Sequence, residues 1–151
     1  MGRLIVLSLF LIVSTVGCAA VSGAPSTVKA GCSYDQAWAI TLASMDEFVL
    51  TQEDKDKGVI ETDWATFASQ RSIGVFQRQG NKERARFFVN VEAARQPVRI
   101  SVRQTREFFS PVGARSQGIA WKRIPPNAGE EQRLVQRITN QLLSKGCTVV
   151  G

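Results

Sequence analysis

The sequence predicts a two-layer α+β domain, in which an N-terminal and a C-terminal helix pack on one face of an antiparallel sheet of about four strands. Helical periodicity near both ends of the mature chain and alternation of apolar and polar residues in its middle support this architecture. Two cysteines, Cys32 and Cys147, bracket the patterned region. Residues 18–151 are enough for one domain and hardly for two.

The first residues have the layout of an export signal. Arg3 follows the amino terminus, and an apolar run over residues 4–13 contains a single polar residue, Ser8. A positive start, a short apolar stretch and small residues before the cleavage site define a secretory signal. The run is shorter than the roughly 20 apolar residues of a membrane-spanning helix. We therefore predict a signal peptide over residues 1–17.

The residues Thr15-Val16-Gly17-Cys18 resemble the bacterial lipobox, which implies that Cys18 becomes the lipidated first residue of a lipoprotein. Stable anchoring takes more than one acyl chain, and a lipobox cysteine carries them. Ala19, in place of Asp, resembles the pattern of lipoproteins delivered to the outer membrane, on its periplasmic side. The alternative is a soluble periplasmic or secreted protein cut after Ala24, since Ser22-Gly23-Ala24 is a small-x-small site.

The mature chain is basic. Lys and Arg outnumber Asp and Glu by 19 to 13, and loss of Arg3 with the signal leaves a net charge of +5. Such a balance is typical of nucleic-acid binding, which export disfavours. Anionic lipid headgroups or acidic envelope proteins are the partners that fit an exported chain, and a merely solvated surface is the alternative. The chain has no histidine, so we expect no metal site and no cofactor.

The remaining cysteines predict a disulfide. With Cys18 assigned to lipid, Cys32 and Cys147 form an even pair in an oxidising compartment. Residues 18–31 are small, polar and interrupted by Pro25, which indicates a flexible tether. We therefore place the folded domain over residues 32–151.

The domain is expected to begin with a helix. Ser33 is a suitable N-cap for a helix that starts at Tyr34. One face of this helix carries apolar residues at the spacing of a buried stripe. These residues are Tyr34, Ala37, Trp38, Thr41, Leu42 and Met45.

A hairpin of strands over residues 48–52 and 59–64 is expected next, with a charged turn at residues 54–58. Asp54 and Asp56 invite comparison with a calcium-binding loop. Gly58 comes too early for that loop, and Ala65 stands where it requires Glu. A charged turn is therefore preferred.

Two alternating strands follow, over residues 84–92 and 98–103, joined through Gln96-Pro97. Their polar side is expected to form the outer face of the sheet, opposed in part by Glu61 and Asp63. This side is a candidate partner-binding face, and an ordinary solvated sheet surface is the alternative. Its basic residues are Arg84, Arg86, Arg99 and Arg103.

The last segments are a loop and a helix. Phe108 and Phe109 are expected to begin an irregular loop that ends at Pro126, either as a lid on the core or as a partner-binding tip. An amphipathic helix is predicted over residues 128–145, with Gly146 as its stop signal. If the two helices are antiparallel, Cys32 and Cys147 become neighbours.

The segment from Asp54 to Trp64, DKDKGVIETDW, resembles the pattern D-x-x-x-G-x-I-x-x-x-W/Y of helix-grip domains in BamC-like outer-membrane assembly lipoproteins. The resemblance extends over roughly residues 33–147 and implies a single helix-grip-like domain. It also implies a non-catalytic role as an accessory of outer-membrane protein assembly, with envelope or assembly proteins as partners.

No catalytic constellation stands out in the sequence, so we expect a protein that is not an enzyme. Our leading hypothesis is an outer-membrane lipoprotein that faces the periplasm and binds envelope proteins. The alternative is a periplasmic lipoprotein that holds a lipid or other amphiphile between sheet and helices.

Overall fold

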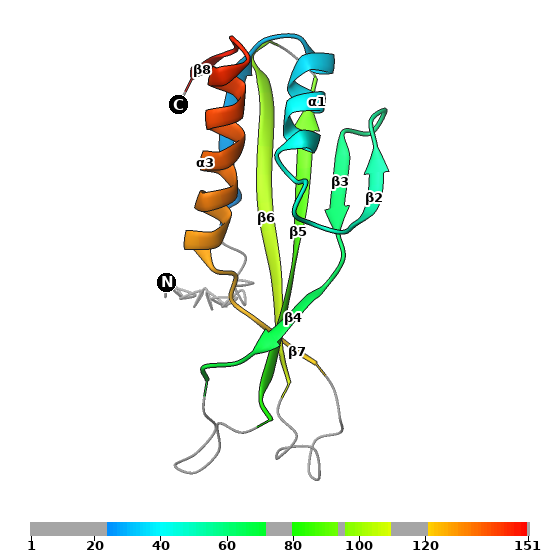
Figure 1. Cartoon of the computed structure of the whole chain (residues 1–151), viewed down its shortest axis with the longest axis vertical. Helices are drawn as coiled ribbons and strands as arrows, with labels where there is room; N and C mark the ends of the chain where they lie inside the picture. Colours follow the sequence, from blue (N-terminus) through cyan, green and yellow to red (C-terminus); the bar gives the residue numbers. More distant parts are fainter. Residues whose placement is uncertain (1–23, 72–79, 94–95, 110–120, 151) are drawn as a thin grey trace, which may run out of the picture.

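The computed structural model describes residues 24–71, 80–93, 96–109 and 121–150, which form an eight-stranded antiparallel sheet and two helices. Figure 1 shows an elongated molecule in which both helices lie beside one another over one part of the sheet. The elements are β1 (Ser26–Gly31), α1 (Tyr34–Ala43), β2 (Leu50–Asp54), β3 (Val59–Thr62), β4 (Ala65–Ala68), β5 (Lys82–Glu92), β6 (Val98–Phe109), β7 (Lys122–Ile124), α3 (Ala128–Ser144) and β8 (Thr148–Val150).

A long hairpin of β5 and β6 is the axis of the sheet. It pairs from Glu92 opposite Arg99 at one end to Lys82 opposite Phe109 at the other. Near the first end it is flanked by β3 and β1, which continue outward to β2 and β8. Near the second end it is flanked by β4 and β7, which pair with nothing further among the described strands. We call these two parts of the sheet the proximal half and the distal half.

Both helices pack on the proximal half, and they run antiparallel. Gln36, in the first turn of α1, donates from Nε2 to the carbonyl oxygen of Lys145 just after α3, at 3.3 Å. The disulfide between Cys32 and Cys147 joins the same ends, with Cα atoms 5.2 Å apart. The predicted disulfide and the predicted N-cap are therefore confirmed, since the Ser33 hydroxyl accepts from the backbone N–H of Gln36 at 3.3 Å.

The hydrophobic core lies between these helices and the proximal half. It follows directly from the alternation in β5 and β6, where every second residue faces the helices and is buried. Its fully buried side chains include Ile60, Val89, Ile100, Val102, Ile138 and Leu142.

The predicted sheet of about four strands with terminal helices is wrong. The described chain begins with β1 and ends with β8, and eight strands are present instead of four. Four of them were not predicted: β1, β4, β7 and β8. All four are short, and all residues of β4 are exposed. Only β1 alternates, with Val28 and Ala30 buried, over too few residues to stand out in the sequence.

Two further boundaries need correction. The flexible tether expected over residues 18–31 is wrong in its last six residues, which form β1; residues 18–23 lie outside the described part of the chain. Phe108 and Phe109 do not begin a loop, because they belong to β6. Among the described residues, no helix is long and apolar enough to cross a membrane.

Candidate binding surface on the outer face of the sheet

The outer face of the sheet, opposite the helices, is the surface on which the predicted arginines meet. Residues with even numbers in β5 and odd numbers in β6 point to this side, and no described helix packs on it. Arg84, Arg86, Arg99 and Arg103 all occupy such positions. They do not form one uniform patch, however, because their partners differ.

Arg84 and Arg86, which lie toward the distal half, are engaged in ion pairs. Arg84 donates from Nε and from a terminal nitrogen to one carboxylate oxygen of Glu107, at 2.8 and 2.6 Å. Arg86 pairs with Glu61 on β3. The predicted opposition of Glu61 to this face is therefore correct. Asp63 instead accepts a hydrogen bond from the backbone N–H of Trp64 at 2.7 Å.

Two tryptophans sandwich Arg84. Its guanidinium carbon lies 4.4 Å from the ring centroid of Trp64 and 4.4 Å from that of Trp121. Arg86 adds a third contact, 4.7 Å from the Trp64 ring. Trp121 in turn packs against Phe109, with centroids 5.5 Å apart. We call Trp64, Arg84, Trp121 and Phe109 the aromatic ladder, since they connect the residues just before β4 and β7 with β5 and β6.

The aromatic ladder has a clear structural role. Cation–π contacts of this kind contribute about 0.5–1 kcal/mol each when partly exposed. They hold the segments just before β4 and β7 onto β5 and β6. Arg84 and Arg86 are therefore positioning groups of the surface and are not free to bind an anion.

Arg99 and Arg103 differ from these two. Both are exposed, and neither makes an ion pair among the described residues. Arg99 stands opposite the like charge of Lys29 on β1 and opposite Glu92 on β5, with which it forms no ion pair. Arg103 stands opposite Phe88, which is 40% exposed. Lys29, Phe88, Arg99 and Arg103 thus form an open basic and aromatic surface on the proximal half, which we call the open basic surface.

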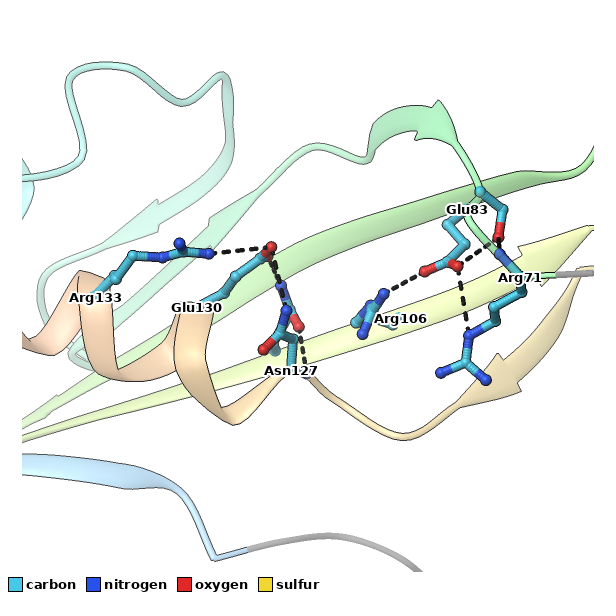
Figure 2. Close-up of polar contacts among 8 residues, drawn as sticks. Arg71, Glu83, Arg106, Asn127, Glu130 and Arg133 are labelled. Atoms are coloured by element: carbon cyan, nitrogen blue, oxygen red, sulfur yellow. Dashed lines mark hydrogen bonds and ion pairs between the residues drawn. The ribbon is translucent and has the colours of Figure 1, made fainter.

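A buried ion cluster occupies the inner side of the distal half, where the helices do not reach (Figure 2). Glu83 on β5, whose side chain is 4% exposed, accepts from Ser69 Oγ at 2.6 Å and from Arg71 Nε at 3.4 Å. Its other oxygen pairs with Arg106 on β6. The cluster acts as a polar core of the distal half, in which the buried Nε of Arg106 has no hydrogen-bond partner among the described residues.

The start of α3 is fastened to β6 by a second polar group (Figure 2). Gln104 donates from Nε2 to Glu130 at 2.6 Å and accepts from the backbone N–H of Asn127 at 2.8 Å. Glu131 accepts from the backbone N–H of Gln104 at 2.7 Å. β1 begins at Ser26, opposite Val102, and does not extend to Gln104. The Glu131 carboxylate therefore accepts from the backbone N–H of Gln104, which has no partner on β1.

Each fixed residue of the pattern in the segment from Asp54 to Trp64 has a structural role. The carboxylate of Asp54 accepts hydrogen bonds from the Lys57 ammonium at 2.7 Å and the Lys57 backbone N–H at 3.0 Å, which lowers the pKa of Asp54. Gly58 has φ +67°, and a Cβ there would lie 2.1 Å from the carbonyl oxygen of Val91. Ile60 belongs to the core, and Trp64 to the aromatic ladder.

A pocket of about 230 Å³ lies between the segment after α1 and the start of α3. Phe48, Phe87 and Leu134 contribute its apolar lining, and Glu47 and Arg137 close its rim with an ion pair at 2.6 Å. The hydrogen bond to Glu47 raises the pKa of Arg137. The pocket is smaller than the roughly 300–1,000 Å³ of typical small-molecule sites.

The described residues contain no group of three or more Cys, Asp or Glu side chains that could hold a metal ion. Cys18, the predicted lipidation site, lies outside the described residues. The chemistry available on the outer face is therefore that of recognition: guanidinium groups, aromatic faces and strand backbone.

No protein-family model matches the chain, and none of the curated proteins compared with it matches significantly. Prediction from sequence placed the arginines on one face but missed Trp64 and Trp121 as members of that face. The available signal was the spacing of Trp121 and Arg123, which are two residues apart and so lie on one side of an extended chain. This spacing becomes meaningful only once β7 is known to pair with β6.

Proposed function

We propose that this protein is a non-catalytic outer-membrane lipoprotein, anchored through Cys18 on the periplasmic side, that binds envelope proteins with the outer face of its sheet. The observation that carries this proposal is the open basic surface. It combines an exposed phenylalanine with three cations that have no ion-pair partner among the described residues. Aromatic residues and arginine are the side chains that most often dominate the energetics of protein interfaces.

The electrostatics favour an acidic protein surface as partner. Arg99 already has Glu92 opposite it on β5, so an acidic partner would act mainly on Lys29 and Arg103, which have no carboxylate opposite them among the described strands. Phe88 would supply the apolar centre. The aromatic ladder next to it keeps the distal strands in place.

The role as an accessory of outer-membrane protein assembly rests on the resemblance of residues 54–64 to BamC-like lipoproteins. A disulfide-linked domain behind an export signal supports a place in the periplasm, because disulfides persist in that compartment. Together these features favour envelope proteins over any cytoplasmic partner.

Site-specific photocrosslinking in the native envelope tests the proposal. A benzophenone amino acid at Arg103 places the crosslinker on the open basic surface, and the same residue at Gln132, exposed on α3, is the matched control. We expect envelope proteins to be captured from position 103 and not from position 132. Equal capture from both positions would refute the assigned surface, and capture without any assembly component would refute the assembly role.

The lipid anchor has its own test. Palmitate labelling of the wild type should be lost in Cys18→Ser. Equal labelling of the two proteins would contradict the anchor and favour the soluble form cut after Ala24.

A lipid or other amphiphile between sheet and helices is the second candidate, and the pocket lined by Phe48, Phe87 and Leu134 is the feature that favours it. Mass spectrometry of gently extracted protein should then detect a bound amphiphile, and Leu134→Trp should displace it. A wild-type protein that carries no such molecule would exclude this candidate.

A further inference from the structure

One strand of the distal half presents an unpaired edge. β4 pairs with β5 on one side, from Ala65 opposite Ala85 to Ala68 opposite Lys82, and with no described strand on the other. All four residues of β4 are exposed. A free strand edge is a template for pairing with another chain, and proteins usually protect it.

The alternation of hydrogen bonds identifies which backbone groups of β4 point outward. Odd-numbered residues of β5 direct their N–H groups to the β3 and β4 side, as the bond from the Val91 N–H to the Gly58 carbonyl shows. Ala65 and Phe67 therefore exchange hydrogen bonds with β5. Thr66 and Ala68 direct their N–H and C=O groups away from the sheet. Neither makes a hydrogen bond on that side within the described residues.

β2, the edge strand of the proximal half on the same side of β5, is protected in ways that β4 lacks. Its register shifts between Leu50 and Gln52, which indicates a bulge. It carries Glu53 and Asp54, and it ends in a turn with an ion pair between Asp54 and Lys57 at 2.7 Å. Bulges and charges are the common devices against edge pairing. β4, with the sequence ATFA, has neither.

The side chains around β4 add a recognition element. Phe67 is 40% exposed and borders a pocket of about 380 Å³. Lys82 lines the same pocket, is exposed and makes no ion pair among the described residues. The pocket can thus seat an apolar side chain, with a carboxylate beside the ammonium group of Lys82.

We propose that the free edge of β4 binds an extended segment of a partner protein as an additional antiparallel strand. The backbone of Thr66 and Ala68 supplies the hydrogen bonds. The segment places an aromatic or aliphatic side chain against Phe67 and an acidic one against Lys82. Strand addition of this kind draws affinity from the main chain and specificity from pockets for alternate side chains. The proposal rests on the proposed function and deepens it, since it names the conformation in which an envelope protein is held.

A second copy of this chain is a poorer occupant than an acidic segment. Pairing of two β4 edges would bring two Lys82 side chains, which make no ion pair among the described residues, toward the same interface. β4 itself has no carboxylate to neutralise them. Charge complementarity therefore favours a foreign segment.

Peptide binding to the full-length protein in detergent micelles tests the proposal. The probe is a fluorescein-labelled peptide of about nine residues, a length typical of strands, with phenylalanine alternating with glutamate and threonine. A shuffled peptide and a peptide N-methylated at alternate residues are its controls. In the protein, Thr66→Pro removes an outward N–H without breaking the β5 ladder. Glu53→Pro is the matched control, because Glu53 occupies an outward position on the β2 edge by the same alternation.

We expect the alternating peptide to bind the wild type and Glu53→Pro alike. Thr66→Pro and the N-methylated peptide should weaken binding by about tenfold. Lys82→Glu should weaken it as well, while Lys145→Glu, an exposed position just after α3, should leave it unchanged. An unchanged Kd in Thr66→Pro, or failure of the wild type to bind the peptide, overturns the proposal. Sedimentation that shows a dimer lost in Thr66→Pro overturns it in favour of self-pairing. Crosslinking from position 103 without peptide binding would leave the proposed function standing and remove only the β4 edge.

Discussion

The proximal and distal halves of the sheet are built from the same two strands but are stabilised by different forces. In the proximal half, inward positions of β5 and β6 hold Val89, Val91, Ile100 and Val102, covered by two helices. In the distal half, inward positions hold Glu83 and Arg106 beside the buried Ala85 and Phe108. Where helices provide an apolar cover, burial of apolar area dominates. Where they stop, ion pairs and stacked rings contribute more of the contacts.

The largest test of this comparison is the disulfide, which ties both helices to the proximal half. Cys32→Ser combined with Cys147→Ser should lower the free energy of unfolding by about 4–5 kcal/mol on the chain-entropy model, since the bond closes a long loop. Urea denaturation measures the loss, with wild type in reducing agent as the parallel control. If the double cysteine variant loses less free energy of unfolding than the Glu83 variant described below, the proximal half does not dominate the stability of the domain.

The second test concerns the buried ion cluster. Glu83→Ala leaves Arg106, whose side chain is 15% exposed, without its carboxylate and should cost about 3 kcal/mol. Replacing both, as Glu83→Leu with Arg106→Leu, should recover most of this loss, because apolar residues of similar size need no charge partner. Hydrogen exchange should show faster opening of β4 than of β3 in the single variant. Equal protection in the two strands would mean that the halves unfold as one unit.

The third test addresses the aromatic ladder. Arg84→Lys keeps the charge but loses the planar group between Trp64 and Trp121, and should cost about 1 kcal/mol. Tryptophan fluorescence should change at the same time. Arg103→Lys, at an exposed position without a stacking partner, should do neither. If Arg84→Lys leaves stability and fluorescence unchanged, the two tryptophans are held in place by packing and not by the guanidinium group.

The smallest effect is expected at the turn between β2 and β3. The pKa of Asp54 lies below its ordinary value because of its hydrogen bonds from Lys57. Its contribution to stability is therefore full above about pH 4 and is lost as the pH falls through the lowered pKa. Asp54→Asn should reduce Tm at pH 7 by less than about 2 °C and flatten the dependence of Tm on pH below pH 4. A thermal scan at several pH values checks this, and an unchanged acid profile would contradict the assignment.

The same division explains what could be predicted from the sequence. α1, α3 and the cores of β5 and β6 were predicted because they bury one regular face, and Cys32 and Cys147 were predicted as a pair by elimination. The continuation of β6 beyond Arg103 was missed, since Arg106 breaks the apolar alternation. β4 and β7 were missed because their residues are mostly exposed and only their pairing defines them.

The candidate surface shows the same pattern. Its four arginines could be assigned to one face from alternation alone. That Arg84 is enclosed by two tryptophans, while Arg103 is open, depends on contacts between residues far apart in the sequence. Side-chain periodicity describes one strand at a time, and it carries no information about which other strand lies beside it.

The placement of β1 has a mechanical consequence. β1 is held on one side by β6 and on the other by β8, and both neighbours are antiparallel to it. Tension applied at Ser26 along the strand axis loads the hydrogen bonds to β6 and β8 in shear. If β1 yields, the next covalent stop is Cys32, which passes the force to the end of α3 before α1 can unravel. A chain pulled from its N-terminal end is thus reinforced at its first strand.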